Sequence, residues 1–337
     1  MRTVAREYSE YTLVESEQNE VKLLRKDRNF DEGFSVEEVA EIDPSIKSFT
    51  DDTRKIVFDN SAPYGHLTTS WVYVLLIELE RLDGPATILF TERPDTRYMR
   101  VEHSSNLTEY LEERFTEKGH TVKYIDADEF YVSNFISFTV PIRNNSANMG
   151  IVADFFSEGL DYSKPPTKKI YLSRAKTTTR KGNKKYRIRN AQELLKDELT
   201  SLRNNNIYQF SDRIDDEEAL EEYLKTLGFT IFCAEDNDSY RDQLQLFASS
   251  KIVMSITSSG LSLCSVMSPN TLVVELVSPM DALGNRNQDA PTFQDIYKNI
   301  STLKANLYLG ISNRHGKAEN IIRSIESNPA LKTLLSS

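Results

Sequence analysis

The chain has little cysteine and no long apolar run. Cys233 and Cys264 are its only two cysteines, and both lie inside apolar segments, so no disulfide framework is indicated. No stretch approaches the roughly 18 apolar residues that a membrane helix requires, and the first residues lack an apolar leader. These absences predict a protein without a membrane span that resides in a reducing cytoplasm.

Negative charge outweighs positive charge, with 51 Asp and Glu residues against 41 Lys and Arg residues. The net charge is -10 and the isoelectric point is about 5.1, which argues against binding nucleic acid or an anionic membrane through the whole surface. The basic run at 176–189 is therefore local, and it is either a solvated hairpin, a lid or a contact to an acidic partner. The length of 337 residues exceeds one usual core and predicts two domains.

Apolar strands alternate with amphipathic helices from Lys55 onwards. Strands are expected at 55–58, 86–91 and 121–125 and helices at 67–82 and 107–118, an order typical of a parallel sheet flanked by helices. Residues 1–50 are polar and acidic and predict a surface extension with little core. Pro165-Pro166 indicates a boundary, which divides the rest into domains at 51–164 and 165–337, with a last helix that returns to the first domain.

The second half repeats this rhythm. Strands are expected at 169–173, 229–234, 251–256 and 271–276, and each is apolar enough to be buried on both faces of a parallel sheet. Ser239 is expected to cap a helix whose stripe is Tyr240, Leu244 and Phe247. The two halves together predict an α/β protein.

Small residues follow the strand at 251–256. Ser258, Ser259 and Gly260 would let backbone N–H groups at the start of a helix, Leu261 to Met267, approach a phosphate, or would let a loop pass close under a neighbouring element. Arg174 follows Ser173 at the carboxyl end of another strand, where ligands of open α/β sheets bind, and a guanidinium matches diphosphate oxygens. Glu275 either accepts hydrogen bonds from a ribose, pairs with a cation or lies at a solvated strand end.

Several motifs of the second half resemble glycosyltransferase family 61 in order and spacing. They are Tyr171-Leu-Ser-Arg174, Arg187-Ile-Arg-Asn190, Gly228-Phe229, the helix Gln243 to Ala248, Ser259-Gly260-Leu261 and Val273-Val-Glu-Leu276. The resemblance covers about 169–279. It departs from the family at Thr257, which stands where members have histidine in a Gly-Pro-His-Gly-Ala-Gly-Leu turn.

The resemblance implies a GT-B fold, in which two Rossmann-like domains face a cleft. It also implies an inverting transfer from a UDP-sugar to a glycan or other hydroxyl acceptor, without a separate cofactor. The residues expected to bind the donor are Ser173, Arg174, Thr257, Ser258, Ser259, Gly260, Leu261 and Glu275. Eukaryotic members carry a membrane anchor that this sequence lacks, so a bacterial or viral cytoplasmic member is expected. Self-association is left open.

The first half offers candidates for the general base. His66 follows the strand at 55–58 and precedes a helix, so it either deprotonates the acceptor or fixes its own turn. Glu92 and Asp95 are rival bases at the end of the strand at 86–91. Asp126 and Asp128 form an Asp-x-Asp motif, which would instead suit a metal-dependent GT-A enzyme. A non-catalytic protein that binds a sugar nucleotide or glycan is the third alternative.

Overall fold

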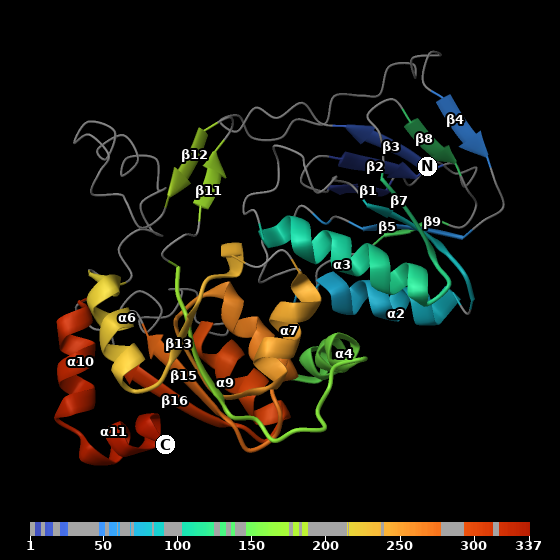
Figure 1. Ribbon diagram of the computed structural model, residues 1–337. Coiled ribbons are helices and arrows are strands. Elements are labelled where there is room, and N and C mark those ends of the chain that lie inside the picture. The colour runs from blue at the N-terminus through green and yellow to red at the C-terminus, as the bar shows by residue number, and fades with distance from the viewer. Residues whose placement is uncertain are drawn as a thin grey trace.

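Figure 1 shows the computed structural model of the chain. Most of the two α/β halves is described with side chains, and eight strands are described by their backbone alone. The described ranges are 54–58, 60, 68, 71–82, 84–90, 103–124, 146–174, 214, 216–236, 239–277, 293–312 and 317–337. The backbone alone is described at 57, 103–105, 146–148, 293–295 and 312, and for the strands at 4–7, 11–15, 21–25, 47–50, 129–132, 136–138, 178–181 and 184–187.

Five parallel strands form the sheet of the second half. Their order across the sheet is β13-β10-β14-β15-β16, and each neighbouring pair is parallel. The strands are β10 (Lys168–Leu172), β13 (Thr230–Phe232), β14 (Ser250–Ile256), β15 (Leu272–Val277) and β16 (Leu307–Ser312). All side chains of β15 are buried, as the apolar pattern predicts for a central strand covered on both faces.

Helices cover both faces of this sheet. They are α6 (Glu217–Thr226), α7 (Tyr240–Ala248), α9 (Phe293–Leu303), α10 (Ala318–Glu326), α11 (Pro329–Ser336) and the 3₁₀ helices η4 (Ala234–Asp236) and η5 (Ser259–Val266). The predicted cap of α7 is confirmed, because the Asp242 N–H donates to Ser239 Oγ at 3.1 Å. The helix expected from Leu261 is the 3₁₀ helix η5 instead.

The first half contains a smaller parallel sheet of order β7-β6-β5-β9. Its strands are β5 (Lys55–Phe58), β6 (Thr87–Phe90), β7 (Thr121–Tyr124) and β9 (Ile136–Phe138), and its helices are α2 (Val72–Leu82) and α3 (His103–Glu117). Gly119 has φ +85° after α3, in the left-handed conformation that a helix end favours. Two parallel sheets flanked by helices confirm the predicted α/β class.

The first fifty residues contain more regular structure than the polar composition indicated. β1 (Val4–Glu7), β2 (Tyr11–Glu15) and β3 (Val21–Arg25) form an antiparallel sheet. β4 (Lys47–Thr50) pairs with β8 (Glu129–Val132) in parallel. The basic segment forms the antiparallel hairpin of β11 (Thr178–Lys181) and β12 (Lys184–Arg187).

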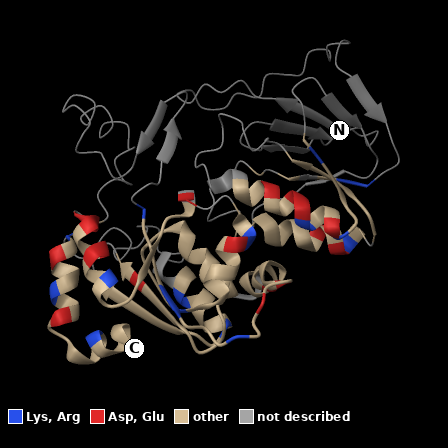
Figure 2. Cartoon of the chain, viewed as in Figure 1, with Lys and Arg blue, Asp and Glu red and all other residues tan. Residues whose placement is uncertain are grey.

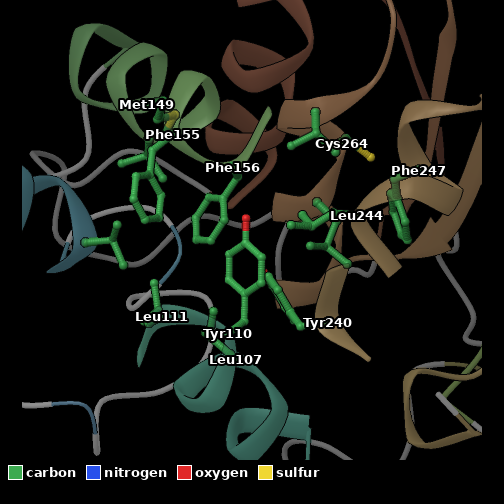
Figure 3. Close-up of a cluster of buried hydrophobic side chains, with 14 of the residues drawn as sticks. Leu107, Tyr110, Leu111, Met149, Phe155, Phe156, Tyr240, Leu244, Phe247 and Cys264 are labelled. Atoms are coloured by element: carbon green, nitrogen blue, oxygen red, sulfur yellow. The ribbon is translucent and has the colours of Figure 1, made fainter. Parts of the chain in front are cut away.

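One hydrophobic core runs through both halves. Its buried members come from β5, β6 and α3 of the first half and from β14, η5 and α9 of the second. The helix α4 (Ser146–Ser157) contacts α2 as well as α7, α9 and η5. Figure 3 shows Tyr110 of α3 pointing toward Phe156 of α4 and Tyr240 of α7. The domain limits proposed from the sequence stay a prediction.

Ion pairs lie beside this core. Acidic side chains are frequent along α3 (Figure 2), and Glu117 pairs with Arg241 of α7 at 3.3 Å. Lys118, after α3, pairs with Glu158, after α4, at 2.6 Å. Exposed pairs of this kind contribute little stability, about 0–1 kcal/mol each, so the apolar contacts dominate the junction.

The last two helices pack in the second half. α10 contacts α6 and α11, and Leu335 of α11 is buried in the second half's own cluster on the other face of the five-stranded sheet. The Lys169 ammonium of β10 donates to the carbonyls of Leu335 and Ser336, at 3.1 and 2.9 Å. The sequence predicted a return to the first half, whereas these described contacts hold the helices to the second. No helix in the described ranges is long and apolar enough to span a bilayer.

Candidate functional site

The strand order of the second half has a switch point between β10 and β14. The first strand of this half, β10, has the second strand, β13, on one side and the third, β14, on the other. The connections therefore leave in opposite directions between β10 and β14, and ligands of open α/β sheets bind at such points, beyond the carboxyl ends of the strands. Ser173 follows β10 and Thr257 follows β14, so the structure brings the two predicted donor segments to one edge.

Hydrogen bonds join the two segments. Ser255 Oγ of β14 donates to the Leu172 carbonyl of β10 at 3.0 Å, and Ser258 Oγ lies 3.4 Å from Ser255 Oγ. Ser258 is the N-cap of η5 and has extended backbone angles. Thr257 and Ser258 are buried, whereas Ser259 is exposed. The part of this turn that is open to solvent is therefore the first turn of η5.

Gly260 lies against β10. A Cβ atom built on Gly260 would stand 2.4 Å from Leu172 Cδ2, closer than side chains tolerate. Leu172 is buried in the core, and Leu261, the residue after the glycine, is fully buried. The glycine therefore lets the turn pass close to a neighbouring element, which was one of the two interpretations of the sequence. Its contact with a phosphate stays a prediction.

Arg174 is half-buried, and its backbone is held by the start of α6. Its N–H lies 3.4 Å from Glu217 Oε1, which also accepts the Tyr171 hydroxyl at 2.8 Å. The Ser173 hydroxyl donates to Glu221 Oε1 at 2.6 Å. These bonds fix the chain at the carboxyl end of β10.

Sequence reasoning missed the carboxylates of α6. Glu217 and Glu218 occupy the first turn of that helix, where acidic side chains stabilise the positive end of the helix dipole. This role within the helix accounts for both glutamates, so their position in the sequence gives no sign of a contact with β10. The one sign was Tyr171 in an apolar strand, because a buried hydroxyl needs a hydrogen-bond partner.

Glu275 is fully buried on β15. Its Oε1 accepts the Thr257 hydroxyl and its Oε2 accepts the Tyr308 hydroxyl, each at 2.6 Å. Complete burial excludes the solvated strand end considered from the sequence. The ribose contact predicted for Glu275 and the donor contact predicted for Thr257 stay predictions.

A segment of the first half reaches η5. The Thr68 hydroxyl donates to Ser262 Oγ at 2.8 Å, and both residues are buried. Thr68 stands two residues after His66 in the sequence, and Ser262 stands three residues after Ser259. The hydrogen bond therefore links Thr68, which lies between β5 and α2 in the sequence, to η5, the helix that begins at the predicted donor turn.

Several predicted residues lie outside the described part of the chain. They are the candidate bases His66, Glu92 and Asp95, the Asp-x-Asp residues Asp126 and Asp128, and the basic run at 176–189 apart from the backbone of its hairpin. Where side chains are described, no three groups of histidine, cysteine, aspartate or glutamate come together as ligands for a metal ion.

Comparison with known proteins matches part of the chain to one protein family. Residues 208–274, which span α6, α7, β14, η5 and the start of β15, match the family model described as Glycosyltransferase 61. The chain is therefore a glycosyltransferase. The family match includes the turn Thr257 to Gly260 and Glu217, so the resemblance seen in the sequence is confirmed over this segment. No curated protein matches the chain.

Proposed function

We propose that the chain is an inverting, metal-independent glycosyltransferase of GT-B type that moves a sugar from a UDP-sugar to a hydroxyl of a glycan or another acceptor. The observation that carries this proposal is the meeting of Ser173-Arg174 with Thr257 to Gly260 at the switch point between β10 and β14. Nucleotides bind at such points in open α/β sheets. The family match over the turn supports a sugar nucleotide as the ligand.

Each donor residue has a proposed role. Arg174 neutralises the diphosphate through bidentate hydrogen bonds, and the backbone N–H groups of Ser259 and Gly260 at the start of η5 approach the same oxygens. As the sugar leaves, negative charge grows on the departing UDP, and fixed donors at that position lower the barrier. Ser173, Thr257, Ser258 and Leu261 shape the turn around the nucleotide.

The acceptor is activated by a base from the first half. We assign this role to His66, with Glu92 and Asp95 as rivals, because a neutral imidazole accepts a hydroxyl proton near neutral pH. The bond from Thr68 to Ser262 supports this role, since it links the segment after His66 to η5. In an inverting transfer the acceptor oxygen attacks C1 of the sugar once, as UDP departs from the opposite face and the base takes the hydroxyl proton.

A metal-dependent enzyme that uses Asp126 and Asp128 is the alternative mechanism. Activity in excess EDTA distinguishes the metal-dependent mechanism from the metal-independent one. The proposed enzyme keeps its rate, because Arg174 and backbone donors offset the charge of the leaving group. An enzyme that holds its donor through a divalent cation loses its rate in EDTA and recovers it with manganese.

The first experiment is a thermal-stability screen of the whole protein with nucleotide sugars. A ligand that binds only the folded state at a hundred times its Kd adds about 2.7 kcal/mol of stability, so the correct donor raises Tm clearly. UDP and UDP-sugars should stabilise the protein, while adenosine and guanosine counterparts should not. Slow release of UDP from the same donor separates the enzyme from a protein that only binds it.

The compartment and partners follow from this proposal. The donor is a cytoplasmic metabolite in polysaccharide biosynthesis, and Cys233 and Cys264 are not joined in a disulfide, which suits the reducing cytoplasm expected from the sequence. Both thiols are buried, so they act as small apolar residues of the core. The acceptor is a glycan or another hydroxyl compound.

A further inference from the structure

Glu275 lies under η5, on the face of the sheet that the shared core covers. Along β15, Val273 belongs to that core and Leu272, Val274 and Leu276 belong to the cluster on the opposite face. Side chains alternate between faces along a strand, so Glu275 shares the face of Val273. Cys264 of η5 is close enough that the charge of Glu275 adds to burial in raising the pKa of its thiol.

Two hydroxyls from neighbouring strands satisfy the buried carboxylate. Glu275 pairs in register with Ser255 of β14 and Gly310 of β16, and its oxygens accept from Thr257 and Tyr308. A buried carboxylate is costly unless it is hydrogen-bonded, and bonds to a charged acceptor are among the stronger ones in proteins. The hydrogen bond to Glu275 fixes the side chain of Thr257. The backbone of Thr257 is held as well, because its N–H donates to the Leu276 carbonyl at 3.2 Å.

Thr257 is the last residue before the donor turn. The next residues, Ser258 to Gly260, begin η5 and supply the backbone donors of the proposed diphosphate site. Ser255 and Ser258 restrain the turn on the side of β10. Glu275 restrains it on the side of β15, so the turn is held from both neighbouring strands.

We propose that Glu275 is a positioning residue, which acts through Thr257 to hold the turn at Ser258 to Gly260 in its binding conformation and does not itself touch the ribose. The inference rests on the proposed function for the identity of the ligand. Tyr308 is the second anchor of the network, because it holds the other oxygen of the same carboxylate. A ribose would have to displace a hydroxyl from a carboxylate that has no solvent-exposed surface.

Binding of two nucleotides separates positioning from direct contact. We would measure by calorimetry the Kd of UDP and of its 2′,3′-dideoxy analogue for wild type, Glu275→Gln and Tyr308→Phe. A positioning role predicts that both variants lose affinity for the two nucleotides by the same factor, about tenfold, the scale of one hydrogen bond to a charged group. A ribose contact predicts that Glu275→Gln loses affinity for UDP alone and that Tyr308→Phe binds as wild type, which would overturn the proposal.

Tyr223→Phe is the matched control. Tyr223 also donates to a glutamate, Glu326 Oε1 at 2.7 Å, but this pair lies on the exposed surface between α6 and α10. The control removes the same kind of bond away from the turn. It should bind both nucleotides as wild type does.

Hydrogen exchange of the unliganded protein gives a readout that needs no ligand. Amides of residues 257–261 should exchange about ten times faster in Tyr308→Phe and Glu275→Gln, while amides of α10 exchange as in wild type. Unchanged exchange at 257–261 in Tyr308→Phe overturns the proposal, even where Glu275→Gln fails to fold. Wild type that binds neither nucleotide contradicts the proposed function, and the exchange result still decides whether Glu275 positions the turn.

Discussion

Tyr110 of α3 and Tyr240 of α7 meet at the junction of the two halves, with ring centroids 5.1 Å apart (Figure 3). Phe156 of α4 completes the group, at 6.0 Å from Tyr110 and 5.9 Å from Tyr240. Burial raises the pKa of Tyr110 to about 12, so its hydroxyl is neutral at every physiological pH. The two halves share this aromatic group, and we therefore expect them to unfold together.

Replacing Tyr110 with alanine should cost about 3–5 kcal/mol of unfolding free energy, the usual effect of removing a large buried ring. A double-mutant cycle with Tyr240→Ala should give a coupling of about 0.5–1.5 kcal/mol. Ile151→Ala is the control, because this α4 side chain is 41% exposed and should change stability by less than about 0.5 kcal/mol. Denaturant unfolding that shows two separate transitions in wild type would contradict a shared core.

Gly260→Ala should destabilise the protein by about 1–3 kcal/mol, since its Cβ would meet Leu172 Cδ2 at 2.4 Å in a packed core. Leu172→Val removes that atom. The double variant should therefore be more stable than the sum of the two single effects by at least about 0.5 kcal/mol in urea unfolding. Strictly additive changes in unfolding free energy would show that the Leu172 side chain adopts another rotamer at no cost in stability.

His120 should make stability fall in mild acid. The Ala86 N–H donates to His120 Nδ1 at 3.3 Å, and burial, followed by the charge of Lys118, lowers the pKa of His120 below 6.5. Above pH 6.5 the imidazole is neutral in both states and its contribution is complete. As the pH falls below 6.5 the unfolded state binds the proton first, so stability is lost until the folded pKa is reached.

The variant His120→Gln isolates this effect. Between pH 7 and 5 its unfolding free energy should fall less than that of wild type, since every other titrating group is unchanged. Equal slopes for the two proteins would show that His120 takes up its proton equally in both states.

His66→Ala should bind UDP as wild type does and transfer sugar about a hundred to ten thousand times more slowly, the usual loss when a general base is removed. His120→Gln serves as the histidine control and should keep full turnover. Near-normal turnover in His66→Ala, together with a folded but inactive Glu92→Gln or Asp95→Asn, would assign the base to a carboxylate.

Much of the fold follows from local patterns. The strand expected at 55–58 is β5 within the same limits, and β14 and β15 differ from their expected limits by one residue, because runs of β-branched residues between turns carry their own signal. The cap at Ser239 is equally local. The sheet at β1 to β3 was missed, since the polar composition of residues 1–50 masked the apolar residues within those short strands.

The residues of the candidate site could be predicted from their types and from their positions at strand ends. The contacts between them depend on which strands are neighbours and in what register those strands pair. Arg174 and the turn at Ser258 to Gly260 could be placed at strand ends from the sequence. The bond from Thr257 to Glu275 requires knowledge that β15 is the neighbour of β14, and the approach of Gly260 to Leu172 joins residues 88 positions apart. Contacts of this kind arise from tertiary packing, which no local pattern encodes.

The affinity of Arg174→Ala for UDP tests the proposed donor site most directly. Loss of a charge-assisted contact to the diphosphate should cost about 1.5–3 kcal/mol, which is roughly a 10- to 150-fold rise in Kd by calorimetry. Lys168→Ala removes one positive charge from an exposed position at the amino end of the same strand, and Lys181→Ala removes one from the basic hairpin, so both should bind UDP as wild type does. An unchanged Kd in Arg174→Ala, or equal losses in all three variants, would contradict a diphosphate site at the end of β10.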